Sequence, residues 1–395
     1  MKRSALLVIF FVCSIALKAQ QNADSCTMEI SLLTCAPGSD LYSLFGHTAI
    51  RVQDARRGMD IIYNYGTFDD TDPAFYFKFT RGIMRYSLSA ETFDDFMQEY
   101  VYEKRSVKAQ VLDLSCVEKN NLYESLRRNT LEENRYYDYH FHTDNCTTRA
   151  ARIIESNTRH PLVYGNILPD PGPSYRDMIH EYLDLQHQAW PEFAIDLLLG
   201  KNLDIKPDNI QAIHFLPDYL YRGTDSAYEG NKALVLAKKN LLSFPEIKSN
   251  GGWITPVTFF TTLLILAVFL FFMRSRPWAV RTLFLFDLIF FTILGLGGLL
   301  IATVWLIRVD DVCRNNMNIL WALPTHLIAV FFIRKKAGWI KYYFLVSALL
   351  TAILLIGFPW WTQRMNIAVL PVLIIIIFRS FNLYQKRNHA EKSLV

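Results

Sequence analysis

Cys146 and His47 are the two residues whose types and positions could together carry out nucleophilic chemistry. Cys146 follows Asp144 and Asn145, both favourable helix N-caps, and precedes the helical run TTRAARIIES. A thiol at a helix N-terminus feels the positive end of the helix dipole, which favours the nucleophilic thiolate. The N–H groups of the same turn can hold an oxyanion. The alternative is a buried or disulfide-bonded cysteine without a catalytic role.

His47 is the candidate base for that thiol. It follows Gly46, which permits a close backbone approach, and it begins a predicted strand. A histidine on an early strand can face a cysteine that begins a later helix and can activate its thiol. A third polar group then orients the imidazole, and Tyr63, Asn64 and Tyr65 on the next strand are candidates. We choose Asn64 because amides often orient such histidines, although the strand register could favour a tyrosine. A purely structural histidine is the alternative.

The elements around these residues predict an α+β domain with a small antiparallel sheet and packed helices. Runs rich in β-branched residues predict strands at 28–35, 47–53, 60–68 and 108–115. Apolar side chains at helical spacing predict helices at 91–105 and 117–131. A strand and a turn at 136–146 then lead into the helix that Cys146 begins.

The segment from 157 to 250 is less regular. PDPGPSYRDMIHEYL predicts a proline turn followed by a helix, and residues 190–200 and 215–225 are rich in aromatic side chains. These stretches either pack on the catalytic domain or lie at a membrane interface, where Trp and Tyr are favoured. The sequence leaves both options open.

The first 19 residues predict a signal peptide. Lys2 and Arg3 precede an apolar run from Ala5 to Leu17, which is short for a membrane crossing, and Ala19 is a small residue before the cleavage point. An exported, periplasmic domain is therefore expected at 20–250.

Five apolar segments after Trp253 predict a helical membrane domain at 251–380, followed by a cytoplasmic tail at 381–395. The segments are 254–273, 283–307, 319–333, 343–360 and 366–378. With the first domain outside, the stretches on the cytoplasmic side hold eleven basic residues: Arg274, Arg276, Arg281, Arg334, Lys335, Lys336, Lys341, Arg379, Lys386, Arg387 and Lys392. The outside loops hold only Arg308, Arg314 and Arg364. This bias follows the positive-inside rule and predicts a multi-pass membrane protein with its first domain outside.

Composition narrows the remaining classes of function. The net charge of +4 comes largely from those loops, so nucleic-acid binding is not expected. No CxxC or His/Cys cluster has metal-ligand spacing, so neither a metal nor another cofactor is expected. Four of the five cysteines after the signal peptide could pair in three ways. Asp287 and His326 lie within apolar segments, either as functional groups or as inter-helix contacts.

Four sequence blocks resemble one known family. LLTCAPGSDLYSLFGHTAIRV, YNYGTFD, FKFTRGIMRYSL and YHFHTDNCTTRAAR are similar to the periplasmic domain of the Lnb-type bacterial lipoprotein N-acyltransferases, and the helical membrane domain continues the resemblance. The order of histidine before cysteine also resembles the circularly permuted NlpC/P60 and lecithin-retinol acyltransferase group. The resemblance implies a permuted papain-like (NlpC/P60-like) domain, followed by an all-α membrane domain of about five transmembrane helices.

The resemblance also implies an activity and a set of site residues. A fatty acyl chain would pass from a phospholipid donor, through a Cys146 thioester, to the α-amine of a diacylated lipoprotein, with His47 as the base. Asn145 and Arg149, which flank the nucleophile, and Tyr63 and Tyr65 are the candidate substrate-binding or oxyanion residues. Two rivals remain: a membrane-anchored NlpC/P60-type peptidoglycan endopeptidase, and a non-catalytic membrane assembly module.

Overall fold

The computed structural model describes residues 26–40, 43–68, 73–245, 252–335 and 337–392. Its residues form two compact units that do not follow chain order. The first unit contains the chain as far as Asp72, residues Met84–Pro171 and residues Asp208–Glu246. The second contains Pro73–Ile83, Gly172–Pro207 and the chain from Ile247 onwards. The predicted signal peptide lies outside the described residues.

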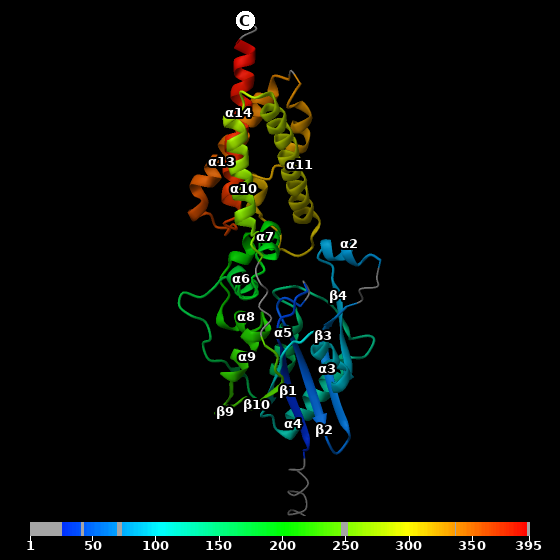
Figure 1. Ribbon diagram of the computed structural model, residues 1–395. Coiled ribbons are helices and arrows are strands. Elements are labelled where there is room, and N and C mark those ends of the chain that lie inside the picture. Colours follow the sequence, from blue (N-terminus) through cyan, green and yellow to red (C-terminus); the bar gives the residue numbers. More distant parts are fainter. Residues whose placement is uncertain (1–25, 41–42, 69–72, 246–251, 336, 393–395) are drawn as a thin grey trace, which may run out of the picture. The chain divides into compact units, whose positions relative to one another are not determined.

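A seven-stranded antiparallel sheet is the framework of the first unit (Figure 1). Its strand order is β10-β5-β1-β2-β3-β4-β6. The strands are β1 Met28–Cys35, β2 His47–Asp54, β3 Met59–Thr67, β4 Arg85–Thr92, β5 Val107–Leu112, β6 Tyr136–Asp138 and β10 Val235–Leu242. A second, three-stranded sheet contains β7 Leu162–Val163, β8 Tyr228–Glu229 and β9 Lys232–Ala233.

Helices cover both faces of the large sheet. The helices of this unit are α3 Phe93–Tyr102, α4 Cys116–Asn129, α5 Cys146–Glu155, α8 Asn209–Ile213 and α9 Pro217–Asp225. On one face, Phe96 and Tyr100 of α3 pack against Leu33, Ala49 and Ile62 of the strands. On the other, α4 and α5 contribute to a larger core that includes Ile50 of β2 and Tyr63 of β3. Because successive residues of a strand point to opposite faces of the sheet, the side chains of β2 and β3 point alternately towards α3 and towards α4 and α5.

Most predicted elements of this unit occur within a few residues of their expected bounds. The sequence did not predict the small sheet of β7, β8 and β9, the helices α8 and α9, or two strands of the large sheet, β4 and β10. RYSLSAET mixes polar and apolar residues along β4, and β10 carries exposed lysines in the middle of its run, so neither has a strong period-two pattern. Their strand conformation comes from pairing, with β3 and β5 respectively, which a local pattern does not encode.

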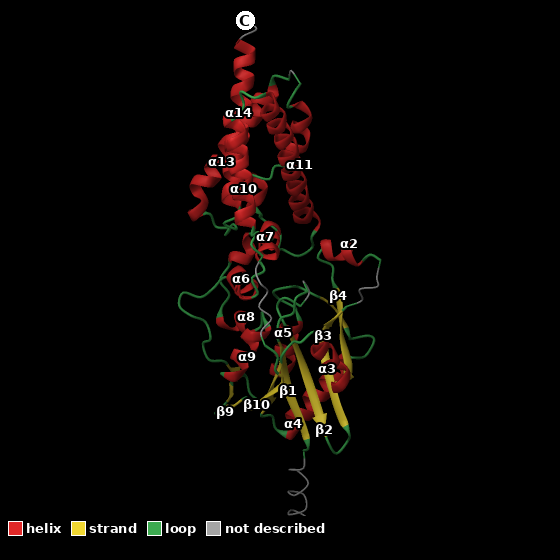
Figure 2. Cartoon of the chain, in the orientation of Figure 1, coloured by secondary structure: helices red, strands yellow, loops and turns green. Residues whose placement is uncertain are grey.

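The second unit is helical, as Figure 2 shows for residues 252–392. Its helices are α2 Phe75–Thr80, α6 Tyr175–Leu185, α7 Ala189–Leu198, η1 Lys201–Asp204, α10 Pro256–Phe272, α11 Pro277–Ile307, η2 Met317–Leu320, α12 His326–Ala329, η3 Val330–Phe332, α13 Trp339–Gly357, η4 Phe358–Trp360 and α14 Val369–Lys392. Among the described residues, three helices are long and apolar enough to cross a membrane: Pro277–Ile307, Trp339–Trp360 and Val369–Lys386. The apolar α10 is shorter.

The helical membrane domain was expected, but one of its segments differs from the prediction. Residues 319–333 form three short helical pieces, η2, α12 and η3, instead of one helix. Pro324 lies between the first two, where its ring and missing N–H interrupt a helix. The predicted tail begins within α14, which continues to Lys392.

The two ionisable residues of the apolar segments both have partners on other helices. Asp287 of α11 accepts two hydrogen bonds from Arg379 of α14, at 2.7 and 2.8 Å. His326 Nδ1 lies 2.8 Å from the hydroxyl of Tyr343 on α13. All four side chains therefore connect helices. Of the two roles considered for Asp287 and His326, this is contact between helices. The side chain of Arg379, which is expected on the cytoplasmic side of the membrane, is buried among the helices.

Candidate active site

Cys146 is the first residue of α5, as its sequence context predicted. Asn145 caps the helix, and its side-chain oxygen accepts a hydrogen bond from Thr148 N–H at 2.9 Å. The Asn145 amide group donates to the carbonyls of Phe141 and Phe215, at 2.8 and 2.9 Å. With both ends of its amide engaged in these three hydrogen bonds, Asn145 holds the start of the helix in place. The thiol itself stays partly exposed.

The imidazole of His47 is fixed by Asn64. His47 Nε2 lies 2.6 Å from Asn64 Oδ1, and a carbonyl oxygen can only accept, so Nε2–H donates. The other end of the amide, Nδ2, donates to Glu91 Oε1 at 3.3 Å, which agrees with this orientation. The tautomer that results leaves Nδ1 of His47 as the acceptor for a proton from Cys146, whose side chain is hydrogen-bonded to the imidazole.

The Cys146–His47 contact shifts both groups towards an ion pair. Burial raises the pKa of the Cys146 thiol, but the charge and hydrogen bond of His47 outweigh it, so the net pKa is lowered from 9.0. The Thr48 N–H, which donates to the sulfur, acts in the same direction. Burial lowers the pKa of His47, yet the charge and hydrogen bonds of Cys146 and Asn64 raise it above 6.5 overall. Both shifts favour the thiolate–imidazolium pair over the neutral pair.

Gly66 provides the space in which the pair meets. It lies at an irregularity in the pairing of β3 with β4, and its φ of +102° is one that L residues rarely adopt. A Cβ placed on Gly66 would be 3.6 Å from both Cys146 Cβ and His47 Cε1. The sequence analysis did not select this residue, although a glycine inside the strand run YNYGTFD is a signal of a bulge or a close approach.

We expect Gly66→Val to reduce the reactivity of Cys146 more than it reduces stability. The positive φ costs a branched residue about 1–2 kcal/mol, and the added methyl groups would separate the thiol from the imidazole. The measurement is the rate of Cys146 alkylation beside a thermal melt. Gly58→Val is the control, because Gly58 also has a positive φ but nothing lies within 4 Å of its Cβ position. Equal loss of reactivity in both variants would contradict this role of Gly66.

The other predicted site residues are engaged elsewhere in this unit. Arg149 forms a two-pronged ion pair with Asp144, at 2.6 and 2.8 Å, and lies over the ring of Tyr137. Tyr63 and Tyr65 are buried in the core beneath α4 and α5, on the face of β3 opposite Asn64. The Tyr65 hydroxyl accepts a hydrogen bond from Asn129 at 2.9 Å. The structure therefore brings together Cys146, His47 and Asn64, and not the two tyrosines.

Aromatic residues that the sequence analysis did not select lie near the nucleophile. Tyr86 of β4 packs on Tyr139 with ring centres 4.5 Å apart, and on Phe68 at 5.2 Å. Burial, and to a smaller degree the charge of Cys146, raises the pKa of Tyr86 to about 12. Burial and the charge of Cys146 also raise the pKa of Tyr139. These rings form an apolar wall beside the thiol.

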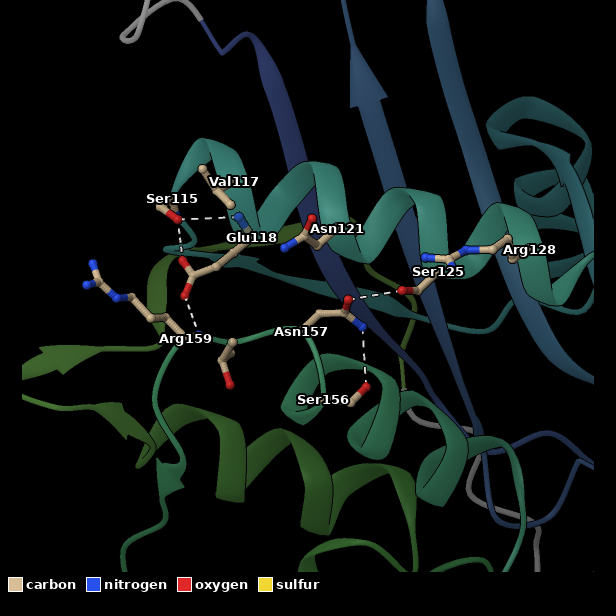
Figure 3. Close-up of a pocket in the computed structure, with 10 residues that line it drawn as sticks. Ser115, Val117, Glu118, Asn121, Ser125, Arg128, Ser156, Asn157 and Arg159 are labelled. Carbon is tan, nitrogen blue, oxygen red and sulfur yellow. Dashed lines mark hydrogen bonds between the residues drawn. The ribbon is translucent and has the colours of Figure 1, made fainter.

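A pocket of about 640 Å³ in the same unit, lined mostly by residues with polar side chains, is separate from this pair (Figure 3). It is lined by residues at the start and outer face of α4 and by residues 156–159 after α5. Glu118 accepts backbone hydrogen bonds from Ser115 and Arg159 there, both at 2.7 Å. None of the pocket's lining residues belongs to the Cys146 site.

A buried cluster in the second unit has ligand types that suit a metal. His180, Glu192 and Asp196 have donor atoms within 4.8 Å of one another. Both carboxylate oxygens of Asp196 are already engaged: Oδ1 accepts from Arg176 at 2.8 Å and from His180 at 2.9 Å, and Oδ2 accepts from Asn366 at 2.9 Å. A guanidinium beside the carboxylate repels a cation. The cluster is therefore better described as an ion-pair network than as a metal site.

Comparisons with known proteins place this site in a family. The model of the Lnb N-terminal periplasmic domain matches residues 16–169, which include His47, Asn64 and Cys146. The model of the Lnb transmembrane domain matches residues 247–390. No curated protein and no solved structure matches the chain. The chain therefore belongs to the family of Lnb-type lipoprotein N-acyltransferases, as a membrane-associated protein of lipoprotein maturation whose N-terminal domain is periplasmic.

Proposed function

We propose that the protein moves a fatty acyl chain from a phospholipid, through a thioester on Cys146, to the α-amine of a diacylglyceryl-cysteine lipoprotein. The observation that carries the proposal is the juxtaposition of Cys146, at the N-terminus of α5, with His47: Cys146 Cβ and His47 Cε1 each lie 3.6 Å from the Cβ position of Gly66. Asn64 holds the imidazole in the tautomer that the chemistry needs. Membership of the Lnb family supports the choice of substrates.

The first half-reaction forms the thioester. The Cys146 thiolate attacks the carbonyl carbon of a phospholipid ester, and the C–S bond forms as the C–O bond to the lysophospholipid breaks. The imidazolium of His47 gives its Nδ1 proton to the leaving alkoxide. The oxyanion is stabilised by N–H groups of the first turn of α5, which have no partners within the helix.

The second half-reaction transfers the acyl chain to nitrogen. The neutral α-amine of the lipoprotein attacks the thioester, and His47 Nδ1 takes one of its protons. The C–N bond forms, the C–S bond breaks, and the thiolate–imidazolium pair is restored. An α-amine has a pKa of about 8, so a useful fraction is neutral near pH 7. The aromatic wall of Tyr86 and Tyr139 helps to keep water from the thioester.

Attachment to the membrane suits two lipid substrates. We infer a multi-pass protein of the inner membrane, with the periplasmic domain acting on chains held in the outer leaflet. Extraction of an acyl chain into water costs about 0.8 kcal/mol per CH₂ group. An enzyme that works at the bilayer avoids that cost, whereas an endopeptidase would need no more than one anchor.

Complementation tests the proposal directly. We expect the wild-type protein to restore a third acyl chain in a bacterium depleted of its own lipoprotein N-acyltransferase. Cys146→Ala should restore none, because the variant lacks the thiol that forms the thioester. The readout is mass spectrometry of a lipoprotein's N-terminal peptide. On purified protein, an acyl adduct on Cys146 that neutral hydroxylamine removes supports the thioester.

As the control, Cys146→Ala should be expressed at the wild-type level and should have the same melting temperature as the wild type in detergent. Lipoproteins that stay diacylated despite good expression of the wild type would contradict acyl transfer. Cleavage of muropeptides by the same preparation would then favour the endopeptidase.

A further inference from the structure

Glu91 completes the site on the side of Asn64 that is turned away from His47. Strand β4 pairs with β3 so that Ser89 is opposite Asn64. Glu91 is two residues further along β4 and therefore lies on the same face of the sheet as Asn64. One amide thus joins the two groups: its Oδ1 accepts from His47 at 2.6 Å, and its Nδ2 donates to Glu91 at 3.3 Å.

We propose that Glu91 is a positioning residue for the Cys146–His47 pair, fixing the Asn64 amide and stabilising the imidazolium with its charge. The two ends of an amide have similar shape and opposite polarity. A flipped Asn64 would present its NH₂ group to His47 Nε2–H, so that two donors would face each other. An ionised carboxylate accepts and cannot donate, so it selects the amide orientation that serves the imidazole.

The surroundings of Glu91 are consistent with this role. It is half-buried, and burial raises the pKa of its carboxyl overall, although the hydrogen bond from Asn64 and the charge of His47 lower it. Asp95 and Glu99 on α3 are the other acidic groups that act on Glu91. Arg105 is the other charged group that acts on His47, and its charge opposes the imidazolium. Glu91 is linked to His47 by hydrogen bonds through Asn64. No such link is seen between His47 and the carboxylates of Asp95 and Glu99.

The test is the pH dependence of Cys146 alkylation by iodoacetamide in the full-length protein. Without the Glu91 charge, the pKa of His47 falls and that of Cys146 rises. We expect Glu91→Gln to slow alkylation by about three- to tenfold below the wild-type midpoint, since one pKa unit changes the thiolate fraction tenfold. Glu91→Ala should shift the profile further. Glu99→Gln is the matched control, because it removes an exposed carboxylate from the same region, and it should leave the profile unchanged.

The catalytic importance of Glu91 rests on the proposed function, but this experiment tests the role of Glu91 separately from acyl transfer. Alkylation involves no acyl donor, so a shifted profile supports the role of Glu91 even if wild-type protein transfers no acyl chain. An unchanged profile in Glu91→Gln and Glu91→Ala would overturn it, even if acyl transfer by the wild type is established.

Discussion

Replacement of His47 by alanine is expected to slow the alkylation of Cys146 at pH 7 by about 100-fold. The charge and hydrogen bond of His47 are the largest of the effects that lower the thiol pKa, while burial raises it. Without the imidazole the pKa of the thiol rises, so less thiolate remains at neutral pH. Acyl transfer should fall further, because the variant also lacks the proton donor for the leaving alkoxide. Mass spectrometry of the alkylated peptide over a pH series gives the rates.

The direction of the pH dependence distinguishes this account from simple loss of fold. In His47→Ala, the onset of alkylation should move to higher pH than in the wild type, and the rate should recover in strong base. His160→Ala is the control, since His160 is an exposed histidine of the same unit. A variant that is unreactive even in strong base would indicate that Cys146 has become inaccessible.

Arg176→Met is expected to have the largest effect on stability. Arg176 is fully buried, and it donates to Asp196 and Asp204, each at 2.8 Å, and to the Gly200 carbonyl at 2.9 Å. Removal of the guanidinium leaves Asp196 buried with one positive partner fewer, and breaking a buried ion pair in this way costs about 3–5 kcal/mol. Thermal unfolding in detergent, followed together with limited proteolysis of the 172–207 segment, measures the loss.

Arg127→Ala is the matched control for that variant. Arg127 pairs with Glu124 on the exposed face of α4, and exposed pairs contribute about 0–1 kcal/mol. A melting temperature for Arg176→Met that matches Arg127→Ala would contradict the importance of the buried network. Arg176→Met with Asp196→Asn should be less destabilised than the single variant, because the second change removes the uncompensated charge.

The core of the candidate site could be predicted from the sequence because its signals are local. Asn145 and Cys146 stand at the boundary between a turn and a helical run, which identifies the N-terminus of α5. Asn64 required a choice among three neighbours, and strand alternation decides it: Tyr63 and Tyr65 point into the core beneath α5, whereas Asn64 points towards His47. Glu91 could not be selected in this way, because its place depends on the pairing of β4 with β3.

The fold was predictable to the same extent. β1, β2 and α5 have clear local patterns and were expected almost as they occur. The predicted helix at 319–333 fails at Pro324, whose effect on the backbone outweighs the apolar composition around it. Arg176 and its partners lie 20 and 28 residues apart in sequence, so no periodic pattern links them.

The position of β10 has a consequence for biogenesis. β5 pairs with β1 along one edge and with β10 along the other, and β10 lies directly before the membrane domain. During translocation from the N-terminus, β5 leaves the cytoplasm long before β10 does, and meanwhile its outer edge has no partner in its own chain. Unpaired edges pair readily with other chains, which promotes aggregation. A secreted fragment that ends with the first family match, at residue 169, would keep that edge open permanently. A fragment for biochemical work therefore has to extend past Leu242.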